Sequence, residues 1–518
     1  MIATLEQHIG DAEKTTFPLR AAALDLGSNA IRYHIVEFSN VDHYVELDSQ
    51  RFPIRLGHDV FTGGKLSERT LEAAVAAAVH FRNRLDALGV GHYRAVATSA
   101  VRESRNGGEL VDRIRRESGV RLETITGSEE ARLVWLAAKH RLRFDRRPWV
   151  LADLGGGSIE VSIVSEQGIH WSESHPMGTV RLLEDFGGTL ENGEDLRDLL
   201  EHYTSRLSLP GGAEEELEGI VITGGNAEAL ADLVENRRTV DGVTEISRKA
   251  LQEVLSRLAS MSFRERVERL GLREDRADVI VPAAVIFDRV AGMAEIERIR
   301  VPRVGVKEGV LYDLVGDVAE HRAHETELDR VTLTGSIALG RRHQFDENHA
   351  RHVADLALSL FDQLESLHGL GETSKRRLGA AALLHDIGQF VSYRRHHKHS
   401  WYLVTHSDLP GLTPDDIRLV ALVTRYHRRS VPKPYHEGYS ELKEREKTEV
   451  EKLSAILRVA DALDHEHRRR VRRVSAKVKQ DKVTLTLDAI GPTPLEAWSL
   501  KKKGGLFEST FDVKLQLA

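Results

Sequence analysis

The sequence predicts two related α/β domains, followed by an all-helical domain and a small α+β end. The first observation is a repeat: LDLGSNAIRYHIV at residues 24–36 recurs as ADLGGGSIEVSIV at residues 152–164, 128 positions later. That spacing is about one domain length. Strand-like and helix-like segments alternate up to about residue 318, which is typical of α/β proteins. Beyond Thr334, apolar residues recur at helical spacing instead.

Shifts in composition divide the 518 residues, because a single core cannot serve so long a chain. The polar stretch 321–329 is typical of a linker. The expected segments are an N-terminal extension (1–17), a first α/β domain (18–141), a second α/β domain (142–318), a helical domain (319–470) and a terminal α+β subdomain (471–518).

The elements follow from apolar periodicity, taken in chain order. In the first domain we expect strands at AAALDLG, YHIVEF and YRAVATSA, and helices at SERTLEAAVAAAVHFRNRLDALG, ELVDRIRRESG and EEARLVWLAAKH. In the second we expect strands at WVLADLGGG, IEVSIV and GIVITGGN, and helices at 283–290 and 307–315. The third part carries helices at HARHVADLALSLFDQLESLHG, RRLGAAALLHDIG and EVEKLSAILRVADALDHEH, and strands at KVTLTLDAI and FDVKLQL.

Composition excludes several classes of protein. There is no cysteine, so disulfides, a thiol nucleophile and thiolate metal ligands are excluded. The net charge of −7 argues against a nucleic-acid partner, and no apolar run is long enough to cross a membrane. The start of the chain lacks the features of a secretory signal, so we expect a cytoplasmic protein. The local basic runs 468–473 and 501–503 are either solvated faces or a strip for a polyanion.

Each copy of the repeat places an aspartate before a glycine turn between two strands. Such a turn lets backbone N–H groups converge on an anion without interference from a Cβ atom. Asp25 and Asp153 would repel a phosphate, so we expect a divalent cation, Mg²⁺, between carboxylate and phosphate. Glu160 is a further candidate for holding Mg²⁺ or its water shell. The predicted phosphate-binding residues are Gly27, Ser28, Asn29, Gly155, Gly156, Gly157 and Ser158.

The order of several motifs resembles one family. These are LDLGSNAIRYHIV, ATSAVRES, ITGSEEARLVW, LADLGGGSIEVSIV, MGTVRL and GVKEGVLYDL, between Ala21 and Leu314. The chain is similar to the exopolyphosphatase / guanosine pentaphosphate phosphohydrolase (Ppx/GppA) family of the actin-like ATPase superfamily. The later ALLHDIG, HHKHSWYLVTHSDLPGL and VTRYHRR resemble its long form, which has an HD-type helical domain. The resemblance implies duplicated actin-like (ribonuclease H-like) domains and a homodimer.

The resemblance also implies roles for single residues. Glu130 would be the catalytic base that activates water, and Glu129 would be structural. Arg102 would hold a phosphate with both arms of its guanidinium. Gly224 and Gly225 resemble a third turn of the superfamily.

Two positions depart from the family. Asn226 stands where a small hydroxyl residue is usual, which leaves the role of the third turn open. Lys307 stands where arginine is common, so the positive charge is kept and the fork is lost.

The helical domain carries the ligand set of HD-type phosphohydrolases: His349, His385, Asp386 and Asp461. Imidazole and carboxylate suit a divalent transition metal or Mg²⁺, so a second divalent metal is expected at this set if it binds one. His399 and His427 could complete a two-metal site.

The leading prediction is an exopolyphosphatase, a phosphoric anhydride hydrolase that releases orthophosphate processively from the ends of inorganic polyphosphate. The nearest alternative is hydrolysis of guanosine pentaphosphate at the same site. Two others stay open: a non-catalytic sensor of polyphosphate or guanosine alarmones, and chemistry that resides in the HD-type domain.

Overall fold

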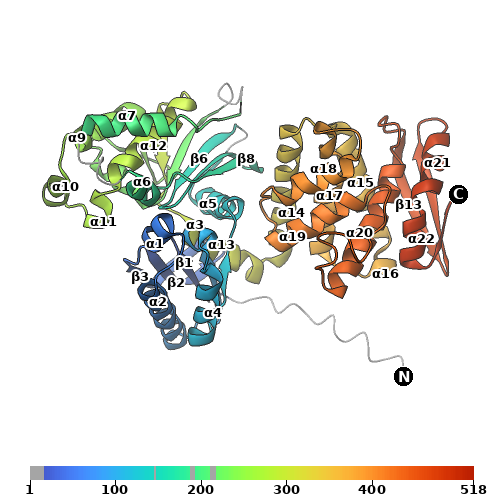
Figure 1. Cartoon of the computed structure of the whole chain (residues 1–518), viewed down its shortest axis with the longest axis horizontal. Coiled ribbons are helices and arrows are strands. Elements are labelled where there is room, and N and C mark those ends of the chain that lie inside the picture. Colours follow the sequence, from blue (N-terminus) through green and yellow to red (C-terminus); the bar gives the residue numbers. More distant parts are fainter. Residues whose placement is uncertain (1–16, 145–146, 187–192, 211–216) are drawn as a thin grey trace. The chain divides into compact units, whose positions relative to one another are not determined.

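A computed structural model describes residues 17–144, 147–186, 193–210 and 217–518. The expected extension therefore lies outside the described residues except for Phe17. The chain forms two compact units, Met1–Glu327 and Leu328–Ala518 (Figure 1). The polar stretch expected as a linker is helical: it belongs to α14 (His321–Arg342), and the unit boundary falls within that helix.

The first half of unit 1 is built on a five-stranded sheet in the order β3-β2-β1-β4-β5. The pairs β3-β2 and β2-β1 are antiparallel, and β1-β4 and β4-β5 are parallel. Its strands are β1 (Leu19–Leu26), β2 (Ile31–Asn40), β3 (His43–Phe52), β4 (His92–Ala97) and β5 (Leu122–Thr124). The helices of this stretch are α1 (Leu56–Gly63), α2 (Glu68–Ala87), α3 (Ser99–Glu103), α4 (Gly107–Ser118) and α5 (Gly127–Arg141).

The second half is built on a seven-stranded sheet in the order β10-β11-β12-β9-β6-β7-β8. Its strands are β6 (Trp149–Leu154), β7 (Ile159–Ser165), β8 (Gly168–His175), β9 (Gly219–Thr223), β10 (Arg238–Val240), β11 (Val243–Ser247) and β12 (Arg298–Val301). Its helices are α6 (Thr179–Asp185), α7 (Gly193–Thr204), α8 (Gly225–Leu233), α9 (Arg248–Ala259), α10 (Phe263–Leu270), α11 (Glu274–Ala277), α12 (Ile280–Met293) and α13 (Val306–Ala319).

The repeat in the sequence is a repeat in the structure. In both copies an antiparallel hairpin, β1-β2 or β6-β7, adds a parallel strand, β4 or β9. The registers also match, because Asp25 lies opposite Arg32 and Asp153 lies opposite Glu160. The duplicated α/β fold is therefore present as predicted, with opposite charges at one equivalent position.

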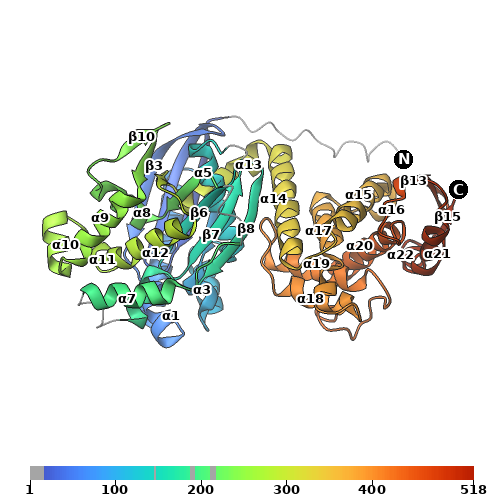
Figure 2. The ribbon, with the colours of Figure 1, turned by 90° about the horizontal axis from the view of Figure 1, so that it is seen from above.

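Two helices pack across the halves (Figure 2). α5 follows the first sheet in sequence but packs against β7 and β8 of the second. α13 follows the second sheet but packs against β1 and β4 of the first. The two helices also pack on each other so closely that a Cβ atom on Gly309 would lie 2.0 Å from the Leu133 carbonyl oxygen. Glycine is required there because the clash would be with backbone.

Unit 2 joins the helices to a three-stranded sheet, β13-β14-β15, through one hydrophobic core. Leu453 of α20 and Phe507 of α22 belong to this same core, so the terminal subdomain is packed onto the helices. After α14, the elements are α15 (Glu347–Gln363), α16 (Glu365–His368), α17 (Glu372–Leu384), the 3-10 helix η2 (Ile387–Phe390), α18 (His396–Thr405), α19 (Pro414–Tyr426), α20 (Glu444–Ala462), β13 (Val471–Lys479), β14 (Lys482–Ala489), α21 (Pro494–Lys503), α22 (Gly505–Phe511) and β15 (Lys514–Leu517).

Across the described parts of the chain, no helix combines the length and the apolar character that a membrane span requires.

Candidate functional site

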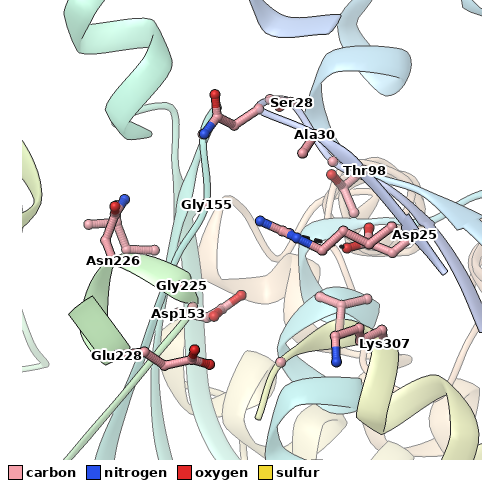
Figure 3. Close-up of a pocket in the computed structure, with 18 of the residues that line it drawn as sticks. Asp25, Ser28, Ala30, Thr98, Asp153, Gly155, Gly225, Asn226, Glu228 and Lys307 are labelled. Atoms are coloured by element: carbon pink, nitrogen blue, oxygen red, sulfur yellow. Dashed lines mark ion pairs between the residues drawn. The ribbon is translucent and has the colours of Figure 1, made fainter. Parts of the chain in front are cut away.

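A cavity of about 420 Å³ lies in unit 1, where the ends of β1, β6 and β9 meet. Figure 3 shows Asp25 and Asp153 turned toward the same space, with Lys307 and Glu228 at its border. The predicted site residues that line it are Asp25, Gly27, Ser28, Asn29, Glu130, Asp153, Gly155, Gly156, Gly224 and Gly225. Segments that are far apart in the sequence therefore form one site.

The two glycine turns have the same backbone hydrogen bond. The N–H of Gly27 donates to the Ala30 carbonyl at 3.2 Å, and that of Gly155 donates to the Ser158 carbonyl at 3.0 Å. The turns also approach each other closely. A Cβ atom on Gly156 would lie 3.1 Å from the Cβ of Ser28, and one on Gly157 would lie 2.3 Å from Ser99 Oγ. Larger residues would push the two halves apart.

A cluster of buried carboxylates lies beside the turns. Oxygens of Glu130, Asp153 and Glu160 all come within 4.8 Å of one another. Ser158 and Ser174 hydrogen-bond the Glu160 carboxylate, with Ser174 Oγ at 2.8 Å. Glu160 is 1% exposed and Glu130 5%, so water screens little of their repulsion.

Burial raises the pKa of every acid in this group. The pKa of Glu160 rises to about 7, with the Asp153 charge as a second cause. The pKa of Glu130 rises well above its ordinary value because of burial and the neighbouring Glu160. Burial also raises the pKa of Asp25 to about 6, although Arg32 at 3.9 Å opposes this. The site therefore holds more negative charge than its surroundings compensate.

The donor set fits a divalent cation. Among the described residues, Asp25 Oδ1, Glu130 Oε2 and Glu160 Oε2 are buried oxygens without a hydrogen-bond partner. Hard carboxylate oxygens are the ligands that Mg²⁺ prefers, and a cation would relieve their mutual repulsion. Asp153 is held in place by Thr223, whose Oγ1 donates to Asp153 Oδ1 at 2.6 Å. Sequence reasoning missed Thr223.

The adjacent glutamates at the start of α5 have different surroundings. Glu130 points into the carboxylate cluster, whereas Glu129 accepts from Arg132 at 2.7 Å and from Arg94 at 3.2 Å. Both arginines also bind Asp313, at 2.8 and 2.7 Å. Glu129 is thus neutralised in an ion-pair network, and Glu130 is not.

Arg102 lies at the edge of the cluster rather than in the cavity lining. Its Nη1 donates to the Ile125 carbonyl at 2.7 Å and lies 3.8 Å from Glu130 Oε2. One arm of the guanidinium is therefore fixed by the backbone next to the predicted base.

Arg276 is a cavity residue that sequence reasoning missed, because its segment reads as an ordinary polar surface. Its Nη1 donates to the amide Oδ1 of Asn226 at 2.8 Å, and no carboxylate of the described residues forms an ion pair with it. Burial and the positive charges of Arg273 and Arg32 lower its pKa to about 10. A Cβ atom on Gly225 would lie 2.5 Å from Arg276 Nη2, so the third glycine turn makes room for this arginine.

The predicted residues of the helical part also come together in unit 2. Nitrogen and oxygen atoms of His349, His385 and Asp386 lie within 4.8 Å of one another, and Asp461 Oδ1 is 4.0 Å from His349 Nε2.

One expectation for this group is wrong. His427 joins the group through Asp386, but His399 does not, and His396 takes its place. The reason is local: Arg395 has a positive φ of 63°, and α18 begins at His396, whose ring reaches Asp386 at 2.9 Å.

Comparison with known proteins now decides the family. The sequence model of the Ppx/GppA phosphatase family matches residues 36–318, and the model of its domain III matches residues 333–503. The chain belongs to the Ppx/GppA phosphatase family.

Solved structures agree with this. An exopolyphosphatase from Cytophaga hutchinsonii is 27% identical with a TM-score of 0.53, and the match covers 57% of this chain and 97% of that one. A Ppx/GppA family member from Aquifex aeolicus is 25% identical with a TM-score of 0.50, covering 59% of this chain and 99% of that one. Both relatives thus correspond to little more than half of this chain.

Membership in the Ppx/GppA family indicates a phosphoanhydride hydrolase, and such phosphatases generally depend on a divalent metal. The buried carboxylates give that dependence a location in this chain. The helical unit matches domain III of the family, and its predicted HD-type relationship stays a prediction. The identity of the metal as Mg²⁺, the homodimer and the cytoplasmic location also stay predictions.

Proposed function

We propose that this Ppx/GppA phosphatase is an exopolyphosphatase, which releases orthophosphate from the ends of inorganic polyphosphate. The observation that carries the proposal is the pairing of a buried carboxylate cluster with a cavity whose border is rich in arginine. The cationic side chains that line the cavity are Arg32, Arg51, Arg273, Arg276, Arg303 and Lys307. Such a border attracts a polyanion, and the cluster provides the acids that hydrolysis needs.

Glu130 is the group we assign to water activation. Its raised pKa suits a base that must accept a proton near neutral pH, and its Oε2 is buried without a partner among the described residues. Arg102, 3.8 Å away, would bind an oxygen of the terminal phosphoryl group with its free arm. The two residues would thus act on opposite sides of the same reacting phosphorus.

Asp25, Asp153 and Glu160 would hold the divalent cation. When bound, Mg²⁺ would neutralise charge on the phosphoryl oxygens and so favour attack by water. Thr223 keeps the Asp153 carboxylate in one orientation. The backbone N–H groups of the two glycine turns would bind phosphate oxygens beside the cation.

Arg276 supports a chain of several phosphates. Its positive charge is not neutralised by an ion pair within the described part of the chain, and its pKa is lowered by neighbouring cations. A bound phosphate would relieve that repulsion. With Arg303 and Lys307 on the same cavity, successive phosphates could be held as the chain shortens, which is what processive release requires.

Polyphosphate is favoured over guanosine pentaphosphate by the cavity lining. None of the described residues that line the cavity is aromatic, so no ring is present there to stack on a guanine base. Hydrolysis of guanosine pentaphosphate at the same residues is the second candidate.

The test uses the full chain with long-chain polyphosphate and with guanosine pentaphosphate, at equal concentrations of terminal phosphate and with or without Mg²⁺. We expect Mg²⁺-dependent orthophosphate release that is faster from polyphosphate. Release from guanosine pentaphosphate alone would contradict the proposed substrate, and binding of either compound without turnover would support the sensor instead.

A further inference from the structure

Histidines and aspartates from four helical segments of unit 2 converge around Asp386. Its Oδ1 lies 2.9 Å from His396 Nε2 and 3.4 Å from His427 Nε2. Its Oδ2 lies 3.8 Å from His385 Nε2. His349 Nε2 belongs to the same group and lies 4.0 Å from Asp461 Oδ1. The two oxygens of one carboxylate therefore face two different pairs of imidazoles.

The outward nitrogen of each imidazole already has a hydrogen-bond acceptor. Nδ1 of His385 bonds to the Ala382 carbonyl and Nδ1 of His427 to the Thr424 carbonyl, both at 2.6 Å. Nδ1 of His396 lies 3.2 Å from the Tyr393 carbonyl. A carbonyl oxygen can only accept, so each of these Nδ1 atoms carries the proton and leaves the Nε2 lone pair free.

His349 follows the same rule with a carboxylate. Its Nδ1 lies 2.8 Å from Asp464 Oδ2, and both residues are about 1% exposed. This carboxylate–histidine pair fixes the ring so that Nε2 faces His385 and Asp386. Nε2 of His349 and Nε2 of His385 are buried and have no hydrogen-bond partner among the described residues. Two unsatisfied imidazole lone pairs at one buried position call for a Lewis acid.

We propose that unit 2 binds two divalent transition-metal ions that share Asp386 as a bridging ligand. The first centre, M1, comprises His349, His385, Asp386 and Asp461. The second centre, M2, comprises Asp386, His396 and His427. Mixed imidazole and carboxylate ligands favour Mn²⁺, Fe²⁺, Co²⁺ or Zn²⁺, whereas the oxygen-only cluster of unit 1 suits Mg²⁺. The proposal is independent of the activity proposed for unit 1.

Two cationic side chains accompany the ligands. Lys503 pairs with Asp461, and Arg428 Nη1 lies 3.0 Å from His396 Nε2. Each carries positive charge beside a ligand and would have to give way as an ion binds. The ligand group is also reached from outside: a cavity of about 250 Å³ borders Asp386 and is further lined by Phe345, Gln389 and Phe390. Ions, water and a small substrate thus have an entrance.

The experiment compares matched histidines of α18 in the full chain. The protein is stripped with a chelator, kept in excess Mg²⁺ and titrated with Co²⁺; bound cobalt is counted by elemental analysis and its visible absorption is recorded. We expect two Co²⁺ per wild-type chain beyond any bound by Asp386→Asn, which removes the bridge. His396→Gln should lose about one equivalent, and the control His399→Gln should lose none.

Folding of each variant is checked independently by thermal melting and by Mg²⁺-dependent hydrolysis, which should match the wild type. Equal cobalt binding by the wild type and Asp386→Asn would overturn the proposal, as would equal losses in His396→Gln and His399→Gln. If Asp386→Asn does not fold, the comparison of His396→Gln with His399→Gln decides. A single equivalent in the wild type would overturn the bridged pair.

Discussion

The two clusters of acids in this chain balance their charge in opposite ways. In unit 1, burial and mutual repulsion raise the pKa of Glu130, Glu160 and Asp25. In unit 2, neighbouring histidines lower the pKa of Asp386 despite burial, and Lys503 and histidines lower that of Asp461. The first cluster lacks cations and the second brings its own. Unit 1 therefore needs an added ion for stability, whereas unit 2 needs one only to satisfy its imidazoles.

The strongest way to break this comparison is Glu130→Gln. The amide keeps the shape of the side chain but cannot accept the proton of the attacking water, so kcat should fall by about 100- to 10,000-fold. Orthophosphate release from polyphosphate measures the loss, and equilibrium dialysis should show polyphosphate still bound.

Glu129→Gln is the matched control, because Glu129 lies in the ion-pair network with Arg94 and Arg132. It should lower the melting temperature and leave turnover per folded molecule near that of the wild type. Turnover that survives in Glu130→Gln and disappears in Glu129→Gln would reverse the assignment of the base.

The next largest effect is expected from Arg276→Met. Loss of one hydrogen-bonded guanidinium contact to phosphate should raise KM for polyphosphate by about tenfold to hundredfold, with a smaller change in kcat. Arg273→Met is the comparison variant, because Arg273 already lies 3.3 Å from Asp275. Initial rates over a range of chain concentrations separate KM from kcat. An equal KM for Arg276→Met and the wild type would remove Arg276 from the substrate path.

The charge imbalance of unit 1 predicts how stability depends on pH without metal. The folded pKa of Glu160 is about 7, above its ordinary 4.5, so the folded state binds the proton more tightly than the unfolded state. This stabilisation is complete below about pH 4.5 and is lost as the pH rises through about 7. For Glu160 it is on the order of 3 kcal/mol.

Thermal melting in a chelator at pH 5 and pH 8 measures the effect. The melting temperature should fall toward pH 8, and Mg²⁺ should restore it. Glu160→Gln should flatten the dependence. A melting temperature that does not change between these pH values in the chelator would show that the cluster is already neutralised.

The smallest effect tests the cation that unit 2 supplies. Lys503→Met frees Asp461 from its ion pair and should tighten Co²⁺ binding by about tenfold or less, the size of one partly buried pair. Lys502→Met is the control, because that ammonium lies over the Trp498 ring at 4.8 Å. Isothermal titration of both variants gives the affinities, and identical values would show that Lys503 does not compete with the metal.

The sequence repeat predicted the part of the site that is local in the chain. A strand, a glycine turn and a strand fix their own geometry, which is why Asp25, Asp153 and both turns were found at the cavity. Residues brought in by tertiary packing left no such signal: Arg276 comes from the segment after α11's start and meets Asn226 only in the folded chain. Asp464 and Lys503 were missed for the same reason, because their partners are 115 and 42 residues away.

The prediction of His399 shows a different limit. HHKH offers three histidines within one helical turn, and periodicity cannot say which ring faces inward. The choice depends on where α18 begins, which the left-handed backbone of Arg395 sets.

The crossed packing of α5 and α13 has a consequence for motion. α5 carries Glu130 and is anchored to the second sheet, where Trp135 Nε1 donates to the Ser165 carbonyl at 3.1 Å. A hinge movement between the sheets would carry Glu130 together with Asp153 and Glu160, and would leave Asp25 and Arg102 behind with the first sheet. Opening would thus dismantle the reacting centre, and closing would reassemble it, so substrate entry and chemistry would occur in separate conformations.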